Sequence, residues 1–362
     1  MLKPRETVTR IPAYHPPLAG REGLRLDFNE NTVGCSPSVL EKLRTINPEQ
    51  LAKYPEREPV EVKVADFLRV SSSELLLTNG VDEAIHLLCQ TYLNPGDEAL
   101  IVVPTYSMYR IYAAAAGADV TAVPYAEGFR FDAEAVRSSI TERTRFIAIA
   151  NPNNPTGTVA SQSDLLQIAH SAPQAAVLID EAYFEFYGQT MLHARRESPN
   201  IFITRTFSKV YGLAGLRVGV LIGDTEQMNS IRLVSSPYNV NAAALACLPT
   251  SIHDRAYIER YVKEALESRS RLEAALQASG LKFWPSQANF VLLQVGSSAL
   301  EAAHFVEAMR CRGILVRDRS NDYGCLGCVR ITVGPREHGD RLLQALQETL
   351  EELGLVQGAL RR

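Results

Sequence analysis

The sequence has no long apolar run, no block of like charges and only six cysteines in 362 residues. A membrane-spanning helix needs about 20 consecutive apolar residues, so the missing run argues against a membrane protein. The formal net charge of -4, with no basic cluster, leaves no surface suited to nucleic acid. Residues 1–6 carry charges and a proline where a signal peptide would be apolar, so we expect a cytoplasmic protein.

The scarce cysteines also limit the classes of site that the chain can hold. They are scattered through a chain long enough to fold without disulfides, which indicates reduced thiols. Cys325-x-x-Cys328 is the one close pair. A zinc site would need two more ligands, and neither a second cysteine pair nor a histidine cluster lies nearby in the sequence. We therefore expect no metal, and interpret the pair as a turn before a strand.

What the sequence does contain is a series of short apolar runs that alternate with segments of helical periodicity. The runs are residues 99–103, 145–150, 176–179, 201–204 and 218–222. They predict buried strands joined by crossovers, and therefore a doubly wound, mostly parallel α/β sheet. Because ligands bind beyond the carboxyl ends of such strands, the residues directly after each run are the candidates for chemistry.

The pattern changes after about residue 224. Residues 257–279 combine many charges with apolar positions at helical spacing, which predicts a long helix. Beyond it, short strand-like runs at 290–293, 314–316 and 329–333 lie among helical segments and predict a smaller α+β domain. With no low-complexity linker between them, we expect the two domains to pack closely. The expected division is an N-terminal arm (1–25), a large domain (26–255) and a small domain (256–362).

Lys209 stands among small hydroxyl residues and glycines in the segment 204–217, with Arg217 eight positions further on. A lysine amine can form a Schiff base, while hydroxyls and a guanidinium supply the donors that a phosphate needs. The combination is typical of a pyridoxal phosphate site. An exposed loop can have the same composition, so the other strand ends must support the interpretation.

Residues 78–84 pass from a strand through Gly80 into a helix, which directs unpaired N–H groups and a positive dipole end at one point. A phosphate would bind there. The alternative is an ordinary helix start with Asp82 and Glu83 in its first turn. The sequence has no G-x-G-x-x-G motif, so a dinucleotide is not supported.

Three further strand ends are polar or aromatic in a way that suits the same cofactor. Tyr106 follows the run 99–103 and offers a flat ring for stacking against a pyridine. The loop 151–157 is dense in turn residues and follows the next run. Asp180 ends an apolar run, where a buried carboxylate needs a cationic partner such as a protonated pyridine nitrogen.

These motifs resemble, in the same order, those of the fold-type-I pyridoxal-phosphate aminotransferases, and the resemblance covers nearly the whole chain. They are Asn-Pro-x-Asn-Pro-Thr-Gly at 151–157, Asp-Glu-Ala-Tyr at 180–183 and Ser-Lys-x-x-x-Leu-Ala-Gly-Leu-Arg at 208–217. Within that family, other segments resemble the histidinol-phosphate aminotransferases: residues 26–31, 53–56, 104–109 and 327–334.

The resemblance implies a role for each cofactor-binding residue. Lys209 would hold pyridoxal 5'-phosphate covalently and then move a proton as general base and acid, while Asp180 would keep the ring nitrogen protonated. Asn154 and Tyr183 would hydrogen-bond the phenolic oxygen, and Tyr106 would stack on the ring. The implied phosphate ligands are Val81 and Asp82 through their backbone, Thr206 and Ser208 through their hydroxyls, and Arg217 through its guanidinium.

The resemblance also implies where the substrates bind. Arg317 and Arg330 would receive the anionic group, because the planar guanidinium meets a carboxylate or a phosphate with two hydrogen bonds. A surface salt bridge is the alternative for either arginine. Tyr14, Asn29 and Tyr54 would line the pocket, with Tyr54 contributed by the other subunit of a homodimer.

Several functions remain open on these residues. The preferred one is transamination between histidinol phosphate and 2-oxoglutarate, which yields glutamate. The rivals are an aromatic-amino-acid aminotransferase and a decarboxylase of a phosphorylated amino acid such as threonine phosphate. A cofactor-binding regulator would need a fused DNA-reading module, for which neither end of the chain has room.

Overall fold

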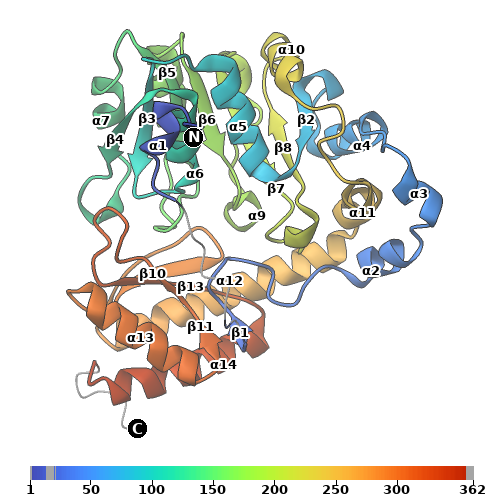
Figure 1. Cartoon of the computed structure of the whole chain (residues 1–362). Coiled ribbons are helices and arrows are strands. Elements are labelled where there is room, and N and C mark those ends of the chain that lie inside the picture. Colours follow the sequence, from blue (N-terminus) through green and yellow to red (C-terminus); the bar gives the residue numbers. More distant parts are fainter. Residues whose placement is uncertain (1, 14–19, 21, 356–362) are drawn as a thin grey trace.

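The computed structural model describes residues 2–13, 20 and 22–355. Its largest element is a seven-stranded sheet in the order β2-β8-β7-β6-β5-β3-β4 (Figure 1). The strands are β2 (Leu75–Thr78), β3 (Glu98–Val103), β4 (Asp119–Pro124), β5 (Thr144–Ala150), β6 (Ala176–Asp180), β7 (Ile201–Thr206) and β8 (Gly219–Ile222). The five strands predicted from apolar runs are β3, β5, β6, β7 and β8, which confirms the doubly wound, mostly parallel α/β fold.

One predicted feature of the sheet is wrong. The spacing of the runs predicts a crossover before each strand, but β8 runs antiparallel to both of its neighbours, β7 and β2. The connection between β7 and β8 contains only a short 3-10 helix, Ala214–Leu216, and has no helix that could carry the chain back to the other end of the sheet. The chain therefore reverses, and the segment that carries Lys209 is a loop closed by two adjacent strands.

Helices cover both faces of the sheet, which explains why the strands are almost continuously apolar. Successive residues point to opposite sides: Ala99 and Ile101 pack with one helical layer, and Leu100 and Val102 with the other. One layer consists of α5 (Gly80–Tyr92), α6 (Met108–Ala116) and α10 (Thr225–Val234). The other layer contains α2 (Pro37–Arg44), α4 (Glu58–Leu68), α7 (Ala133–Ser138), α8 (Gln162–Ser171) and α11 (Ala242–His253). Two short helices, α3 (Pro48–Ala52) and α9 (Phe184–Tyr187), complete this part.

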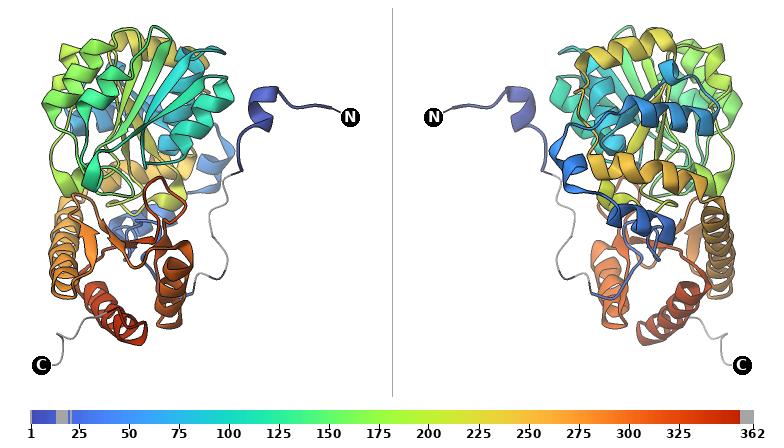
Figure 2. Two further views of the ribbon diagram at one scale, coloured as in Figure 1. Left: turned by 90° about the vertical axis from the view of Figure 1, so that its left-hand side faces the viewer. Right: turned by 90° about the vertical axis from the view of Figure 1, so that its right-hand side faces the viewer.

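The C-terminal part is an α+β layer beside one end of the large sheet, as predicted (Figures 1 and 2). Its antiparallel sheet has the order β12-β13-β10-β9. The strands are β9 (Lys282–Trp284), β10 (Phe290–Gln294), β12 (Arg317–Asp318) and β13 (Cys328–Thr332). The long predicted helix is α12 (Arg255–Ala278), whose first turns pack with the large sheet's layer and whose last turns pack beneath the small sheet. Helices α13 (Ala299–Cys311) and α14 (Arg336–Glu352) cover the same face.

The first described segments lie against both parts. Helix α1 (Glu6–Thr9) lies beside α6, where Arg5 Nη2 donates to the carbonyl oxygen of Ala115 at 2.9 Å. Strand β1 (Leu24–Arg25) pairs in parallel with β11 (Ile314–Leu315), so residues 24–26 pack with the C-terminal layer. The division into arm, large and small domains remains a proposal. None of the helices within residues 2–13 and 22–355 has both the length and the apolar character needed to cross a bilayer.

Candidate active site

Most of the predicted residues meet where the carboxyl ends of the parallel strands face the small sheet (Figure 1). Hydrogen bonds join the strand ends: Thr105 Oγ1, after β3, donates to Asn153 Oδ1, after β5, at 2.8 Å. From the small sheet, Arg330 Nη1 in β13 donates to Asn154 Oδ1 at 2.5 Å. Residues separated by more than a hundred positions in the sequence therefore form one network.

Asp180 is the last residue of β6, and only 6% of it is exposed. Its carboxylate accepts hydrogen bonds from Tyr109 Oη at 2.5 Å, Thr204 Oγ1 at 3.0 Å and the Ala182 backbone N–H at 3.1 Å. Burial raises the pKa of Asp180, although these three donors favour the charged form. A cation next to this carboxylate would stabilise its negative charge, and the predicted pyridinium is such a cation.

Tyr109 is a site residue that the sequence reasoning did not single out. It is fully buried in α6, and its ring meets that of Tyr106 edge to face at 5.7 Å. The signal in the sequence is the spacing of three between the two tyrosines, which would place both on one face of a helix that included Tyr106; in the structure α6 begins only at Met108. An apolar helix face has the same pattern, so the sequence does not distinguish the two cases.

Lys209 lies in the loop between β7 and β8, where its Nζ donates to the carbonyl oxygen of Phe28 at 3.1 Å. Burial, with a smaller contribution from the charge of Arg330, lowers the pKa of Lys209 to about 8. The lysine is therefore neutral near neutral pH far more often than an exposed lysine is, and a neutral amine is the nucleophilic form.

Tyr183 and Asn154, the pair predicted at the phenolic oxygen, have different partners here. Tyr183 Oη accepts from Asn29 Nδ2 at 2.8 Å, and Asn29 Oδ1 accepts from Thr332 Oγ1 at 3.0 Å. Asn29 is 1% exposed and adopts the left-handed conformation with φ 55°, so its side chain is held by a defined turn. The network thus joins the predicted substrate residue Asn29 to the predicted cofactor residue Tyr183.

Arg330 is 5% exposed and has only neutral oxygens as hydrogen-bond partners among the described residues. Its Nη2 donates to the carbonyl oxygen of Asp27 at 2.6 Å, and its Nε has no partner within the described part of the chain. Burial, followed by the charge of Arg319, lowers the pKa of Arg330 to about 9. Arg317 lies directly opposite Arg330 in the β12–β13 register, with its guanidinium 5.2 Å from the Phe28 ring. Two arginines on adjacent strands create a site for an anion.

The start of α5 forms a second site for an anion. A Cβ on Gly80 would lie 2.6 Å from Arg217 Nη2, so the absence of a side chain makes room for the guanidinium above the helix start. Arg217 Nη2 donates to Asp82 Oδ2 at 3.1 Å, and Tyr106 Oη donates to Asp82 Oδ1 at 2.7 Å. The helix has no side-chain cap, so first-turn N–H groups remain for an anion.

The β-sheet register brings Thr206 to this second anion site. Thr78, Gly219 and Thr206 are lateral neighbours on β2, β8 and β7. Thr206 Oγ1 accepts from the Ser208 backbone N–H at 3.1 Å, and both residues are 7% exposed. The donors predicted for a phosphate therefore gather around the start of α5, next to Lys209 and on the same sheet edge as Asp180.

Two predicted residues are not part of this network. Tyr14 lies outside the described residues. Tyr54 follows α3 on the surface, 78% exposed, with its ring stacked on that of Tyr238 at 4.3 Å. Within the described residues, no group of three or more histidines, cysteines, aspartates or glutamates is arranged to hold a metal ion.

This arrangement fits pyridoxal phosphate: a buried carboxylate for the ring nitrogen, a lysine of lowered pKa and a gathered set of phosphate donors. The family comparison agrees with the geometry. Residues 21–346 match the family model of class I and II aminotransferases, so the chain belongs to this family and is a pyridoxal-phosphate-dependent aminotransferase.

Individual relatives narrow the comparison to one branch. The chain is 35% identical to a histidinol-phosphate aminotransferase of Geobacillus sp. (strain WCH70), covering 92% of each chain. It is 36% identical to that of Dehalococcoides mccartyi, covering 90% of each. The structure also resembles the histidinol-phosphate aminotransferase of Sinorhizobium meliloti solved with pyridoxal-5'-phosphate, with a TM-score of 0.87 and 25% identity. That alignment covers 96% of this chain and 97% of the other.

Proposed function

We propose that this aminotransferase exchanges the amino group between L-histidinol phosphate and 2-oxoglutarate, in the cytoplasm, as a step of histidine biosynthesis. The similarity to named histidinol-phosphate aminotransferases over about nine-tenths of the chain supports the substrate. The observation that carries the proposal is Arg330, a buried cation whose hydrogen-bond partners are neutral. Such a group is costly unless an anion compensates its charge, and both proposed substrates supply one.

The bound cofactor supplies an electron-withdrawing ring that accepts the electron pair left when the substrate Cα loses its proton. Asp180 would keep the ring nitrogen protonated, and Tyr109 and Thr204 hold the Asp180 carboxylate in place. Lys209 Nζ accepts the Cα proton as a general base, for which a pKa of about 8 is suited to neutral pH.

The other residues bind and orient. Tyr106 would stack on the ring, while Tyr183 and Asn154 would hydrogen-bond the phenolic oxygen. The phosphate would be bound by the backbone of Val81 and Asp82, the hydroxyls of Thr206 and Ser208, and the guanidinium of Arg217. Tyr14, Asn29 and Tyr54 line the substrate pocket.

Histidinol phosphate has no carboxylate, so its phosphate occupies the anion site that the other half-reaction fills with a carboxylate of 2-oxoglutarate. Arg330 and Arg317 therefore serve both half-reactions. The planar guanidinium of Arg330 can give two hydrogen bonds to either group, while its neighbour Arg317 adds positive charge.

Arg330→Lys keeps the charge but loses the two-pronged contact, so we expect kcat/KM to fall for both substrates by about ten- to a hundredfold. This corresponds to a charge-assisted contact of about 1.5–3 kcal/mol. Cofactor binding is expected to be retained. The matched control is Arg143→Lys, in an exposed ion pair with Asp119. A loss confined to one of the two substrates would contradict a shared anion site.

We further propose a homodimer in which Tyr54 reaches the partner's active site. Tyr54 and Tyr238 are 78% and 55% exposed and stack on each other, which makes an aromatic surface of the kind enriched at protein interfaces.

Mixing Tyr54→Ala chains with Lys209→Ala chains tests this arrangement. Each mixed dimer is expected to contain one site with both defects and one site with neither, so activity should reappear after subunit exchange. Mixing two preparations of Lys209→Ala provides the control without recovery. If exchange is demonstrated and no activity returns, Tyr54 does not act across the interface.

The substrate assignment is tested by measuring glutamate formation, and carbon dioxide release, with three amine donors. Histidinol phosphate is expected to react much faster than phenylalanine or threonine phosphate. A preference for phenylalanine would make the protein an aromatic aminotransferase. Release of carbon dioxide from threonine phosphate would place it among decarboxylases.

A further inference from the structure

Cys325 and Cys328 have no part in the proposed chemistry, yet the fold brings them together in a tight turn. The Cys328 backbone N–H donates to the carbonyl oxygen of Cys325 at 2.9 Å, and β13 begins at Cys328, which confirms the predicted turn before a strand. The ends of such a turn lie within about 7 Å of each other between Cα atoms. Disulfides span about 4.4–6.8 Å between Cα atoms, so the turn meets the main distance requirement for one.

The turn is fixed by its surroundings. Gly327 has φ 73°, a conformation that favours glycine, and a Cβ there would collide with the carbonyl oxygen of Gly296. The carbonyl oxygen of Gly327 also accepts from the Val295 backbone N–H at 2.9 Å. The two thiols are therefore held together by the packed backbone rather than by a loose loop.

The two thiols are in hydrogen-bond contact and differ in character. The hydrogen bond from Cys325, helped by the nearby charge of Lys282, lowers the pKa of Cys328 even though burial opposes this. The same contact and burial raise the pKa of Cys325. Cys328 is therefore the sulfur that more readily becomes a thiolate, the nucleophilic form, and Cys325 is the candidate resolving cysteine.

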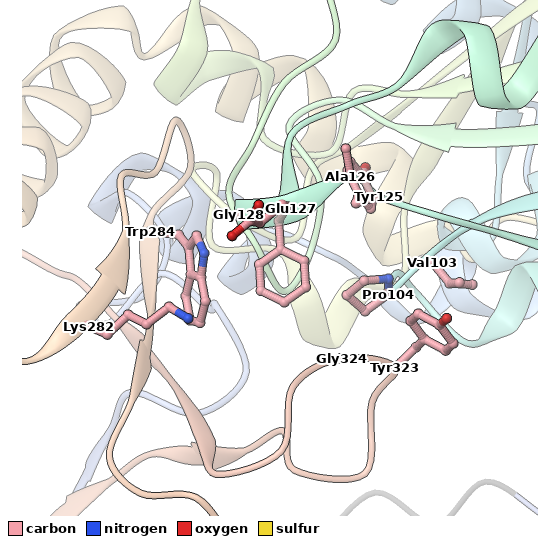
Figure 3. Close-up of a pocket in the computed structure, with 11 residues that line it drawn as sticks. Val103, Pro104, Tyr125, Ala126, Glu127, Gly128, Lys282, Trp284, Tyr323 and Gly324 are labelled. Atoms are coloured by element: carbon pink, nitrogen blue, oxygen red, sulfur yellow. The ribbon is translucent and has the colours of Figure 1, made fainter.

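A cavity of about 220 Å³ lies at the junction of the large and small sheets (Figure 3), and its lining ends at Gly324, the residue before Cys325. Lys282, Trp284 and Gly324 line it, and Trp284 also packs in the same apolar cluster as both cysteines. Cys325 and Cys328 are 0% and 1% exposed. Neither cysteine lines the cavity, but Gly324 precedes Cys325 directly, so a small oxidant, which needs only about 10–15 Å³, can come within one residue of the buried pair.

We propose that Cys325 and Cys328 form a redox pair that hydrogen peroxide converts reversibly into an intrachain disulfide, and that the disulfide changes substrate affinity at Arg330. The Cys328 thiolate attacks one peroxide oxygen, the O–O bond breaks, and hydroxide leaves with a sulfenic acid on Cys328. The Cys325 sulfur then attacks Cys328 Sγ, the S–O bond breaks, and the sulfenic hydroxyl leaves with the Cys325 proton as water. In total, two thiols and one peroxide give one disulfide and two waters.

The turn is coupled to the substrate site through the β12–β13 hairpin. Arg317 in β12 and Arg330 in β13 lie opposite each other, and the Cys328 carbonyl oxygen accepts from the Arg319 backbone N–H at 2.9 Å. Closing an S–S bond at the end of this hairpin therefore acts on the strand that places Arg330. This part of the inference rests on the proposed function of Arg330, whereas disulfide formation does not.

The first experiment maps the disulfide in the holoenzyme. Trypsin releases residues 320–330 as one peptide that contains both cysteines. After peroxide treatment and alkylation, we expect this peptide to lose both alkyl groups and to weigh about 2 Da less than the dithiol form, reversibly with dithiothreitol. Cys311→Ser, at an exposed cysteine, should leave the result unchanged, whereas Cys325→Ser and Cys325→Ala should abolish it. Continued alkylation of both cysteines, or their irreversible oxidation without a disulfide, would overturn the redox pair.

The second experiment measures kinetics before oxidation, after oxidation and after reduction. We expect KM for the anionic substrates to change by about fivefold or more, with unchanged cofactor content, and to return on reduction. Cys325→Ala should be insensitive to peroxide. If the disulfide forms and KM stays constant, the coupling to Arg330 is wrong. If histidinol phosphate is not a substrate at all, the proposed function fails while the peptide map still decides the redox pair.

Discussion

Replacing Asp180 with asparagine is expected to lower the transamination rate by several orders of magnitude while the protein stays folded. An amide has nearly the same shape as the carboxylate and can accept from Tyr109 or Thr204, but it carries no charge to hold a ring nitrogen protonated. Cofactor affinity should fall as well, because the ion pair is lost. Steady-state kinetics with a circular dichroism check of the fold measures both effects, and near-normal turnover would leave Asp180 a purely structural role.

Tyr109→Phe provides a graded comparison for this variant. It removes one hydroxyl donor to Asp180, and a hydrogen bond to a charged group contributes about 1.5–3 kcal/mol, so activity should fall about ten- to a hundredfold. Tyr92→Phe is the matched control, because the Tyr92 hydroxyl donates to Gln227 rather than to an active-site group. Equal losses in the two tyrosine variants would show that packing, not the carboxylate, causes the effect.

Replacing Lys209 with alanine is expected to lower the transamination rate by several orders of magnitude, as Asp180→Asn does. A positioned general base contributes about 10²–10⁴-fold to a rate, and the covalent link to the cofactor is lost too. Borohydride reduction of the wild type should fix the cofactor on the peptide that contains Lys209, and mass mapping should find no label there in the variant. Label on another lysine would contradict the assignment.

The lowered pKa of Lys209 predicts that capture of the cofactor by the wild-type protein depends on pH. Only the neutral amine attacks an aldehyde, and burial shifts the pKa from 10.5 to about 8. The rate at which the cofactor-free protein captures pyridoxal phosphate should therefore rise with pH through about 8 and level off above it. A rise centred near 10.5 would mean that the lysine is not desolvated before the cofactor binds.

Much of the fold follows from local sequence, because strands covered on both faces are apolar throughout. β6, for instance, is a buried run with a single carboxylate at its end, and it marks both a strand and a site. β4 is different. It is an edge strand whose exposed positions include Asp119, so the sequence there has no apolar run that would predict a strand.

The missed features depend on the three-dimensional arrangement. The direction of β8 depends on whether the segment after β7 packs as a helix, which its length alone does not decide. Likewise, the contact between Arg330 and Asn154 joins residues 176 positions apart, and Tyr109 differs from a core tyrosine only in what lies beside its hydroxyl. Motifs identify which residues take part, whereas the tertiary fold decides which of them touch.

The reversal of chain direction between β7 and β8 also limits which changes in chain length this enzyme can tolerate. Residues 207–218 leave one buried strand and enter the adjacent one at the same edge, so both ends of the segment are anchored to the core of the sheet. Lys209 and Arg217 stand near opposite ends of it, and their separation is set by the chain length between two fixed points. Surface loops usually accept an added residue at little cost in free energy. An inserted residue here would displace the amine from the phosphate site, so this connection should keep a constant length wherever the chemistry is retained.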